Sequence, residues 1–176
     1  FDAHTPAFKN NSFDNIIMID VLHHLANPVL FLNNAHKILN QNGRIIILEP
    51  YSSLFSGIIY SIFHKEPFDF NDPLFDKGNK VDSKRAFAAN QATAQILFYL
   101  RANEFHRNFQ ARYKIVKKEL LSCISYPFSG GFENKSFLPD FLIELLIKSE
   151  KYLSLLGKLI AFRTLIVLEK TEPSQI

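Results

Sequence analysis

The chain has 176 residues, of which 47% are hydrophobic and 21% charged, so it has the size and composition of one globular domain. This composition excludes a disordered segment, and the apolar runs are too short for a membrane-spanning helix. The net charge of +3 is too small to indicate a nucleic-acid partner, which usually needs clustered Lys and Arg. The single cysteine, Cys123, excludes an intrachain disulfide and a multi-cysteine zinc site, so we predict a reducing, cytoplasmic compartment.

The first fifty residues predict a strand, a helix and a second strand. Phe13–Asp20 reads FDNIIMID, a short Ile-rich run typical of a buried parallel strand. Asn27 and Pro28 have the residue types of a helix start, and the helical spacing of apolar residues continues to Gly43, which we expect to cap the helix end. Arg44–Leu48 (RIIIL) is the second strand. A strand, helix and strand within about forty residues form a βαβ unit, so we expect parallel neighbours buried on both faces.

The remaining residues alternate apolar helices with two further strands. We expect a helix after Ser52 or Ser53, a helix near Ala86–Leu100, a strand over Tyr113–Leu121, a helix over Phe137–Leu156 and a last strand over Phe162–Glu169. We therefore predict one domain over residues 1–170, with helical excursions over 51–110 and 122–161. The tail, residues 171–176, is expected to fray.

Phe1–Pro50 also contains a series of short motifs in a characteristic order. They are an Asp-Ala pair, a Pro-x-Phe turn, Ser-Phe-Asp before a strand, His-His-Leu after it, a helix followed by Gly, and a strand ending in Glu-Pro. This order and spacing resemble class I S-adenosylmethionine-dependent methyltransferases of the small-molecule "type 11" kind. The resemblance implies an α/β, Rossmann-like methyltransferase fold with a mostly parallel sheet, an antiparallel last strand and, in this chain, helical insertions.

The resemblance also implies which residues bind S-adenosyl-L-methionine. Asp2 would accept a hydrogen bond from the adenine amino group, a role that suits a carboxylate because it only accepts. The backbone N–H of Ala3 would face a ring nitrogen of adenine. Ile19 and Asp20 would lie beside the sulfonium, at the carboxyl end of their strand, where ligands of open α/β sheets bind.

In the family pattern, His23 and His24 begin the segment that borders the acceptor pocket. Either imidazole could take a proton from a hydroxyl acceptor, and we favour His24 slightly; packing of one imidazole in the core is the alternative. Adjacent histidines on a strand or turn are expected to point apart, and no Cys or carboxylate follows at ligand spacing, so we predict no metal site. Glu49, at a strand end, is either an active-site carboxylate or a solvated one.

Two features of the family have no counterpart in this sequence. The six glycines, at 43, 57, 78, 130, 131 and 157, form no GxG turn, and the acidic residue that binds the ribose is absent. We therefore expect the chain to be the carboxyl-terminal portion of a methyltransferase domain whose amino-terminal strands lie upstream of Phe1. On its own, such a chain would expose an apolar sheet edge, so we expect it to be unstable and not to bind the cofactor.

Three functions follow from these patterns. The favoured one is methyl transfer to a small or lipid-like hydrophobic acceptor, because the two helical excursions are rich in Phe, Leu and Ile. The residues that we expect to line the acceptor pocket are Phe55, Tyr60, His64, Gln91, Tyr126 and Phe128. The second is a non-catalytic half-domain that binds another chain through its sheet edge. The third, a nucleotide-dependent enzyme, is disfavoured by the lack of a glycine-rich phosphate loop. Phe137–Leu156 is either a core helix or a contact with a membrane surface.

Overall fold

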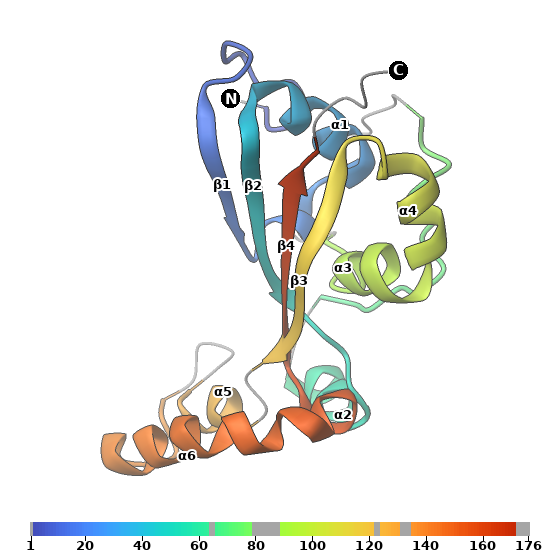
Figure 1. Cartoon of the computed structure of the whole chain (residues 1–176). Helices are drawn as coiled ribbons and strands as arrows, with labels where there is room; N and C mark the ends of the chain where they lie inside the picture. Colours follow the sequence, from blue (N-terminus) through green and yellow to red (C-terminus); the bar gives the residue numbers. More distant parts are fainter. Residues whose placement is uncertain (1, 64–65, 79–88, 122–123, 131–134, 172–176) are drawn as a thin grey trace.

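A four-stranded sheet forms the centre of the molecule. The computed structural model describes residues 2–63, 66–78, 89–121, 124–130 and 135–171. The strands are β1 (Phe13–Ile19), β2 (Leu39–Pro50), β3 (Tyr113–Leu121) and β4 (Arg163–Lys170), in the spatial order β1-β2-β4-β3 (Figure 1). β1 and β2 are parallel, and β4 runs antiparallel to both β2 and β3. The expected parallel neighbours and antiparallel last strand are therefore confirmed, and β1, β2 and β3 share one direction.

Helix α1 (Pro28–Ile38) begins as the sequence predicts. Asn27 is its N-cap, because its side-chain oxygen accepts a hydrogen bond from the Leu30 N–H at 2.8 Å. Asn27 also donates to the Gly78 carbonyl at 2.8 Å through its side chain, and its backbone N–H donates to Nε2 of His4 at 3.1 Å. This one residue therefore joins the start of α1 to two other segments.

The expected helix cap at Gly43 is wrong. α1 ends at Ile38, the next residue is already extended, and β2 starts there, so Gly43 lies inside β2. A Cβ at Gly43 would lie 2.8 Å from the Asn40 carbonyl oxygen and 3.2 Å from that of Asp14. Glycine is needed here because the backbone of Asn40 and that of Asp14 both approach it closely. Close backbone approach is, besides helix capping, a common reason for a glycine.

Several further helices follow β2. They are α2 (Leu54–Phe63), α3 (Thr93–Gln95), a π-helical turn (Ile96–Leu100), α4 (Ala102–Phe109), α5 (Ser125–Phe128), α6 (Asp140–Leu153), a 3₁₀ turn (Ser154–Leu156) and α7 (Gly157–Ile160). A 3₁₀ turn, Leu22–His24, follows β1. The expected helix near Ala86–Leu100 is found only from Thr93 onward, and its first residues lie outside the described chain. Helix α4 was not predicted.

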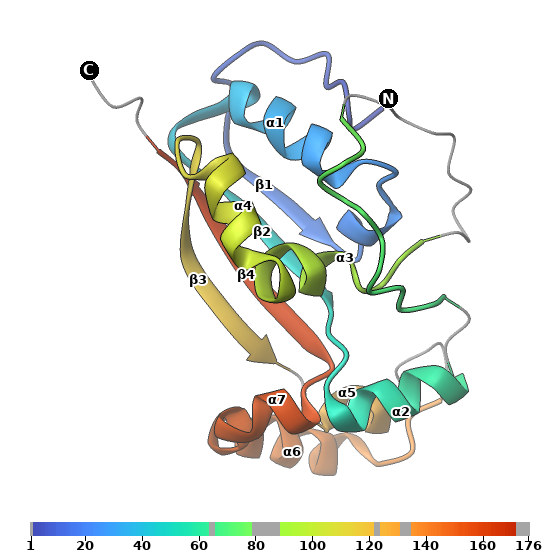
Figure 2. The same ribbon diagram turned by 90° about the vertical axis from the view of Figure 1, so that its right-hand side faces the viewer.

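The core lies on one face of the sheet. α1, α3 and α4 all cover this face (Figure 2). Buried side chains of α1, α4 and the π-helical turn Ile96–Leu100 pack against alternate strand residues. The cluster includes Phe31, Leu32, Leu97, Phe98, Phe105 and Phe109 from the helical side and Met18, Ile45, Ile47, Ile166 and Leu168 from the strands. This alternation is the period of two that β-strands impose on their side chains.

No helix of the described residues covers the opposite face of the sheet (Figures 1 and 2). Ile17 and Ile19 of β1 point to that face and are 65% and 57% exposed. The expectation that β1 is buried on both faces is therefore wrong, because the helices that follow it pack on one side only.

A separate group of helices lies beyond the carboxyl ends of β1 and β2. α2 packs against α7, and α5 packs against α6, as Figure 2 shows. Large apolar side chains of this group are exposed, among them Ile58, Phe141, Leu145 and Tyr152. Among the described helices, none is long and apolar enough to cross a bilayer. Contact of Phe137–Leu156 with a membrane surface stays a prediction.

Candidate functional site

A buried carboxylate joins the ends of the two parallel strands. Ile19 of β1 lies opposite Leu48 of β2, so Glu49 reaches the turn that follows β1. One oxygen of Glu49 accepts the backbone N–H groups of Val21 and Leu22 at 2.9 and 2.7 Å, and the other lies 2.5 Å from Nδ1 of His23. Glu49 is completely buried. The alternative of a solvated Glu49 is therefore wrong.

The buried carboxylate determines the orientation of the His23 ring. With Nδ1 facing Glu49, the proton of a neutral imidazole resides on Nδ1, and Nε2 is the nitrogen that can take another proton. Nε2 lies 3.4 Å from a carboxylate oxygen of Glu66. Gln91 donates to the same oxygen at 3.2 Å. His23 therefore lies between two carboxylates, with Glu49 at Nδ1 and Glu66 at Nε2.

His24 stacks on His23 instead of pointing away from it. The ring centroids are 4.2 Å apart with an interplanar angle of 36°, and the His24 side chain is exposed. The expectation that the two rings point apart on a strand or turn is wrong. The residues lie in a 3₁₀ turn, which does not alternate successive side chains between two faces as a strand does, and the two rings contact each other.

Two groups of side chains in this region bring possible metal-ligand atoms within 4.8 Å of one another. They are His23, His24 and Glu66, and Asp20, His23 and Glu49. In the second group, Glu49 already accepts two backbone N–H groups and faces His23 Nδ1, so its oxygens are occupied by hydrogen bonds. The absence of a metal role for the two histidines stays a prediction.

Asp20 lies directly after β1 and pairs with an arginine from β4. Its φ is +54°, a left-handed conformation that Asp adopts more readily than most residues, and its N–H donates to the Leu48 carbonyl. Its carboxylate accepts a hydrogen bond from Nη2 of Arg163 at 2.6 Å. Burial alone would lower the pKa of Arg163, but the hydrogen bond and charge of Asp20 outweigh it and raise that pKa.

Asp2 is an exposed, ionised carboxylate near the start of the chain. Its Oδ1 accepts hydrogen bonds from the backbone N–H of His4 at 2.9 Å and from the His4 ring at 2.7 Å, and these bonds lower the pKa of Asp2. Ala3 is half-buried against the core. The structure thus leaves Asp2 negatively charged at neutral pH and accessible to a hydrogen-bond donor.

An aromatic cluster surrounds Phe162, the residue before β4. The Phe162 ring centroid lies 6.1, 5.7 and 6.0 Å from those of Phe55, Tyr60 and Tyr126. The Tyr60 hydroxyl donates to the Phe162 carbonyl at 2.8 Å, and burial raises the pKa of Tyr60. Three of the candidate pocket walls therefore meet at one point. Of the others, Gln91 contacts Glu66, Phe128 is exposed, and His64 lies outside the described residues.

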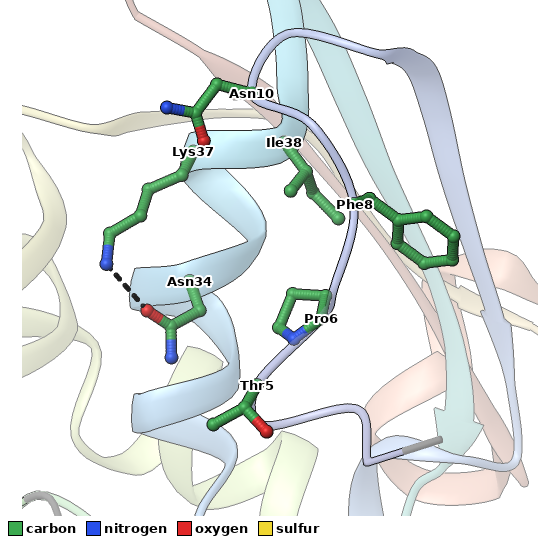
Figure 3. Close-up of a pocket in the computed structure, with 7 residues that line it drawn as sticks. All are labelled: Thr5, Pro6, Phe8, Asn10, Asn34, Lys37 and Ile38. Atoms are coloured by element: carbon green, nitrogen blue, oxygen red, sulfur yellow. Dashed lines mark hydrogen bonds between the residues drawn. The ribbon is translucent and has the colours of Figure 1, made fainter.

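A pocket of about 210 Å³ lies elsewhere, between the loop before β1 and the end of α1 (Figure 3). It is lined by Thr5, Pro6, Phe8, Asn10, Asn34, Lys37 and Ile38, and Lys37 donates to the Asn34 side chain at 2.9 Å across its rim. This pocket lies beside the start of β1, at the other end of that strand from His23. It is therefore separate from the His23–Glu49 pair, although its residues Thr5 and Pro6 follow Asp2 and Ala3 in the same loop.

Sequence reasoning missed two charged residues of the site. Arg163 carried a weak signal, because it is a charged residue at the start of a strand sequence, RTLIVLE, whose centre is apolar. Glu66 carried none, because it lies in a loop and reaches His23 across more than forty residues of sequence.

Comparison with known proteins agrees with the resemblance seen in the first fifty residues. Residues 1–47 match the family model described as "Methyltransferase domain". Among curated proteins, the probable polyketide synthases 10 and 42 of Dictyostelium discoideum are 37% and 34% identical over 71 and 68 residues, which is 40% and 38% of this chain. The chain spans only 3% and 2% of the length of these two relatives.

Among solved structures, a SAM-dependent methyltransferase from Methanosarcina mazei matches 97% of this chain and 65% of its own, with a TM-score of 0.51 and 13% sequence identity. At this identity the likeness concerns the fold alone. It confirms the Rossmann-like methyltransferase fold that the sequence predicted.

Proposed function

Since residues 1–47 match a methyltransferase domain and the chain has the fold of class I S-adenosylmethionine-dependent methyltransferases, we propose that the protein transfers a methyl group to a small or lipid-like hydrophobic acceptor. The family match supports enzymatic methyl transfer with S-adenosyl-L-methionine as the donor. The observation that carries the proposal is the buried His23–Glu49 pair at the carboxyl ends of two parallel strands, where ligands of such sheets bind.

The residues present fit the nucleoside end of the donor. Asp2 offers an ionised, exposed carboxylate to the adenine amino group, which is a donor, and the adjacent Ala3 would present its backbone N–H. Ile19 offers an exposed apolar side chain, and Asp20 a carboxylate, at the end of β1. We therefore propose that Asp2, Ala3, Ile19 and Asp20 contact the donor.

We place the general base at His23, with His24 as the second candidate. Glu49 holds the proton on Nδ1, so Nε2 is the nitrogen that can take the acceptor's proton, and Glu66 lies 3.4 Å from it. Glu49 is a positioning residue, because it acts through His23. His24 is exposed and stacks on the same ring, so it can meet an acceptor that approaches from solvent.

When bound, the donor supplies an activated methyl group whose transfer leaves a neutral thioether. The protein therefore needs to stabilise little new charge on the leaving group, and its main contribution is to hold the acceptor in line with the methyl carbon. His23 takes the acceptor's proton onto Nε2 only where the acceptor is a hydroxyl or an activated carbon.

The aromatic cluster around Phe162 supports an apolar acceptor. Phe55, Tyr60 and Tyr126 come from the helical excursions and converge beside Arg163 at the start of β4. The curated relatives are probable polyketide synthases, so we propose an acceptor of the same chemical kind, an acyl chain that carries carbonyl groups. Such a chain is both apolar along its length and polar at its carbonyl oxygens.

A second candidate function is a non-catalytic binding module. The apolar residues Ile17 and Ile19 on the uncovered face of the sheet support it, because exposed apolar surface of this kind commonly marks an interaction site.

The two functions can be separated with the intact protein, tritium-labelled S-adenosylmethionine and two acceptors, a β-keto acyl thioester and a medium-chain alcohol. We expect labelled product, and a loss of about 10²-fold or more in His23→Gln. His106→Gln, which changes an exposed histidine of α4, is the matched control. No labelled product from either acceptor, together with no heat of donor binding, would overturn methyl transfer and favour the binding module.

A further inference from the structure

Arg163 is a buried cation at the edge of the site, and the proposed function leaves it without a role. It begins β4 opposite Pro50, at the carboxyl end of β2, and is 8% exposed. Its Nη2 donates to Asp20 at 2.6 Å. Its Nε is also buried but has no hydrogen-bond partner among the described residues. The guanidinium therefore has one donor occupied by Asp20 and another without an acceptor.

A buried N–H without an acceptor is unfavourable and uncommon in folded proteins. Arg163 cannot relieve it by losing a proton, because a guanidinium stays charged at all relevant pH values. Glu49, a fully buried carboxylate of the site, is committed to Val21, Leu22 and His23. The acceptor that suits a guanidinium best is an oxygen with negative charge, such as a carboxylate or an enolate.

The guanidinium is held in one orientation. Its central carbon lies 5.6 Å from the centroid of the Tyr126 ring, which gives a favourable cation–π contact. The carboxylate of Asp20 holds Nη2 of the guanidinium, and the left-handed backbone of Asp20 directs that carboxylate. The donors of Arg163 are thus preorganised, as a binding site for an anionic oxygen requires.

Asp20 also connects Arg163 to the general base. Ligand atoms of Asp20, His23 and Glu49 all lie within 4.8 Å of one another. The Asp20–Arg163 pair therefore lies beside the His23–Glu49 pair.

We propose that Arg163 binds an anionic oxygen of the methyl acceptor, the carboxylate or enolate oxygen of an acyl chain, and that Asp20 holds the guanidinium in place before the acceptor binds. The inference rests on the proposed methyl transfer. In the enolate case, the acceptor's C–H bond breaks and its proton passes to Nε2 of His23. The electron pair of that bond moves onto the carbonyl oxygen beside Arg163. The same pair then forms the new C–C bond, while the S–CH₃ bond breaks and leaves its electrons on sulfur.

Calorimetric titration of the intact protein with three probes tests this inference. Octanoate carries a carboxylate, 2,4-octanedione an enolisable carbonyl, and 1-octanol neither. We expect octanoate or the dione to bind at least tenfold more weakly to Arg163→Gln, with Arg163→Lys in between and 1-octanol unaffected. Binding of octanoate alone assigns a carboxylate, and binding of the dione alone assigns an enolate.

Asp20→Asn separates a binding role from a structural one. If Arg163 binds an anion, loss of the negative charge at Asp20 should tighten octanoate or dione binding several-fold, while the amide oxygen of this variant can still accept the hydrogen bond from Nη2 that orients the guanidinium. If Arg163 serves only to pair with Asp20, the same change should not improve binding. Arg44→Gln is the matched control, because Arg44 pairs with Glu169 at the far end of the same two strands. Melting temperatures of all variants are measured alongside, and where Arg163→Gln does not fold, Asp20→Asn decides.

The inference is overturned if neither octanoate nor the dione binds the wild-type protein, if Arg163→Gln binds them as well as wild type, or if Asp20→Asn fails to tighten binding. Loss of the proposed function has a different signature. In that case no acceptor is methylated, although octanoate binding still depends on Arg163.

Discussion

Nδ1 of His23 lies 2.5 Å from a carboxylate oxygen of Glu49, a residue 26 positions further along the chain. This contact is available because β1 and β2 run in parallel and end side by side. It joins the turn after one strand to the last residues of the next. The orientation of the candidate base therefore depends on the pairing of two strands and not on the local sequence around the histidine.

The first prediction concerns Glu49→Gln. The amide oxygen can still accept the N–H groups of Val21 and Leu22, but the amide nitrogen would face His23 and force the ring proton onto Nε2. The base is then in the wrong tautomer, so we expect methyl transfer to fall about 10²-fold or more. Steady-state rates measure the effect.

Glu150→Gln is the control for that variant. Glu150 likewise accepts two backbone N–H groups, those of Ile124 and Ser125, but contacts no histidine in the described structure. We expect a stability change of similar size in both variants and a rate loss in Glu49→Gln only. Equal rate losses would show that Glu49 acts through the fold alone.

The second prediction concerns donor binding through Asp2. Because its carboxylate is ionised and exposed, Asp2→Ala should weaken S-adenosylmethionine binding by the intact protein about tenfold, the loss of one charge-assisted hydrogen bond. Isothermal titration calorimetry gives the affinity, and Asp14→Ala, an exposed aspartate in β1, is the control. Unchanged affinity in Asp2→Ala would remove the adenine assignment.

The third prediction concerns alkaline pH. Burial raises the pKa of Tyr60 and Tyr113 above the ordinary value near 10, whereas both ionise normally in the unfolded chain. Above about pH 10 the native state then binds more protons than the unfolded state. Their contribution to stability is present below that pH and is lost as pH rises, by about 1.4 kcal/mol per pH unit for each tyrosine.

Urea unfolding between pH 9 and pH 12, a range of about three units around the ordinary tyrosine pKa, measures this loss. Tyr113→Phe removes one titrating group and should flatten the decline, at the cost of the hydrogen bond from its hydroxyl to the Leu32 carbonyl. Tyr152→Phe, at an exposed position of α6, should leave the slope as it is. A parallel decline in all three proteins would contradict the assignment.

The fourth prediction concerns Gly43 in β2. The Cβ of Gly43→Ala would lie 2.8 Å from one carbonyl oxygen and 3.2 Å from another, so backbone has to move. We expect a loss of about 1–3 kcal/mol, the usual cost of overpacking, seen as a lower urea midpoint. Gly57→Ala is the matched control, since its Cβ meets only the Ser52 hydroxyl, a side chain that can rotate, and alanine favours helix α2. Equal destabilisation by both changes would argue against a special role for Gly43.

The fifth prediction concerns the uncovered face of the sheet. β1 lies at the edge of the described sheet and exposes Ile17 and Ile19 on the same face, so the 176-residue chain should self-associate there. The double variant Ile17→Lys, Ile19→Lys should shift the sedimentation profile toward the monomer. Leu155→Lys, on the helical group, should not. If Leu155→Lys has the larger effect, the helices are the associating surface.

The sequence predicted the sheet well because its strands are local signals. Phe13–Asp20 and Phe162–Glu169 are short, Ile- and Val-rich runs, and each lies within one residue of the observed strand. The cap at Gly43 was wrong because glycine serves both helix ends and close backbone contacts, and only the tertiary structure distinguishes them. Periodicity also cannot reveal that one face of β1 lacks a covering helix.

The candidate site was only partly predictable for a related reason. His23 and His24 were identified as candidates because a histidine side chain can exchange a proton near neutral pH and because the family pattern has residues of the acceptor pocket at their position. Glu49 was noted only with two alternative roles, and Glu66 and Arg163 were missed, since all three come from other parts of the chain and meet the histidines or Asp20 only after folding. Residue type indicated the chemistry, but burial and pairing required the three-dimensional arrangement.

Few other residues can replace Asn27 without loss of a hydrogen bond. Its side-chain oxygen, side-chain nitrogen and backbone N–H each have a different partner, in α1, at Gly78 and at His4. Aspartate could replace the accepting oxygen but not the donating nitrogen, and lysine could replace the donor but not the acceptor. Random mutagenesis with selection for folded protein should therefore return asparagine at this site far more often than at the exposed asparagines nearby.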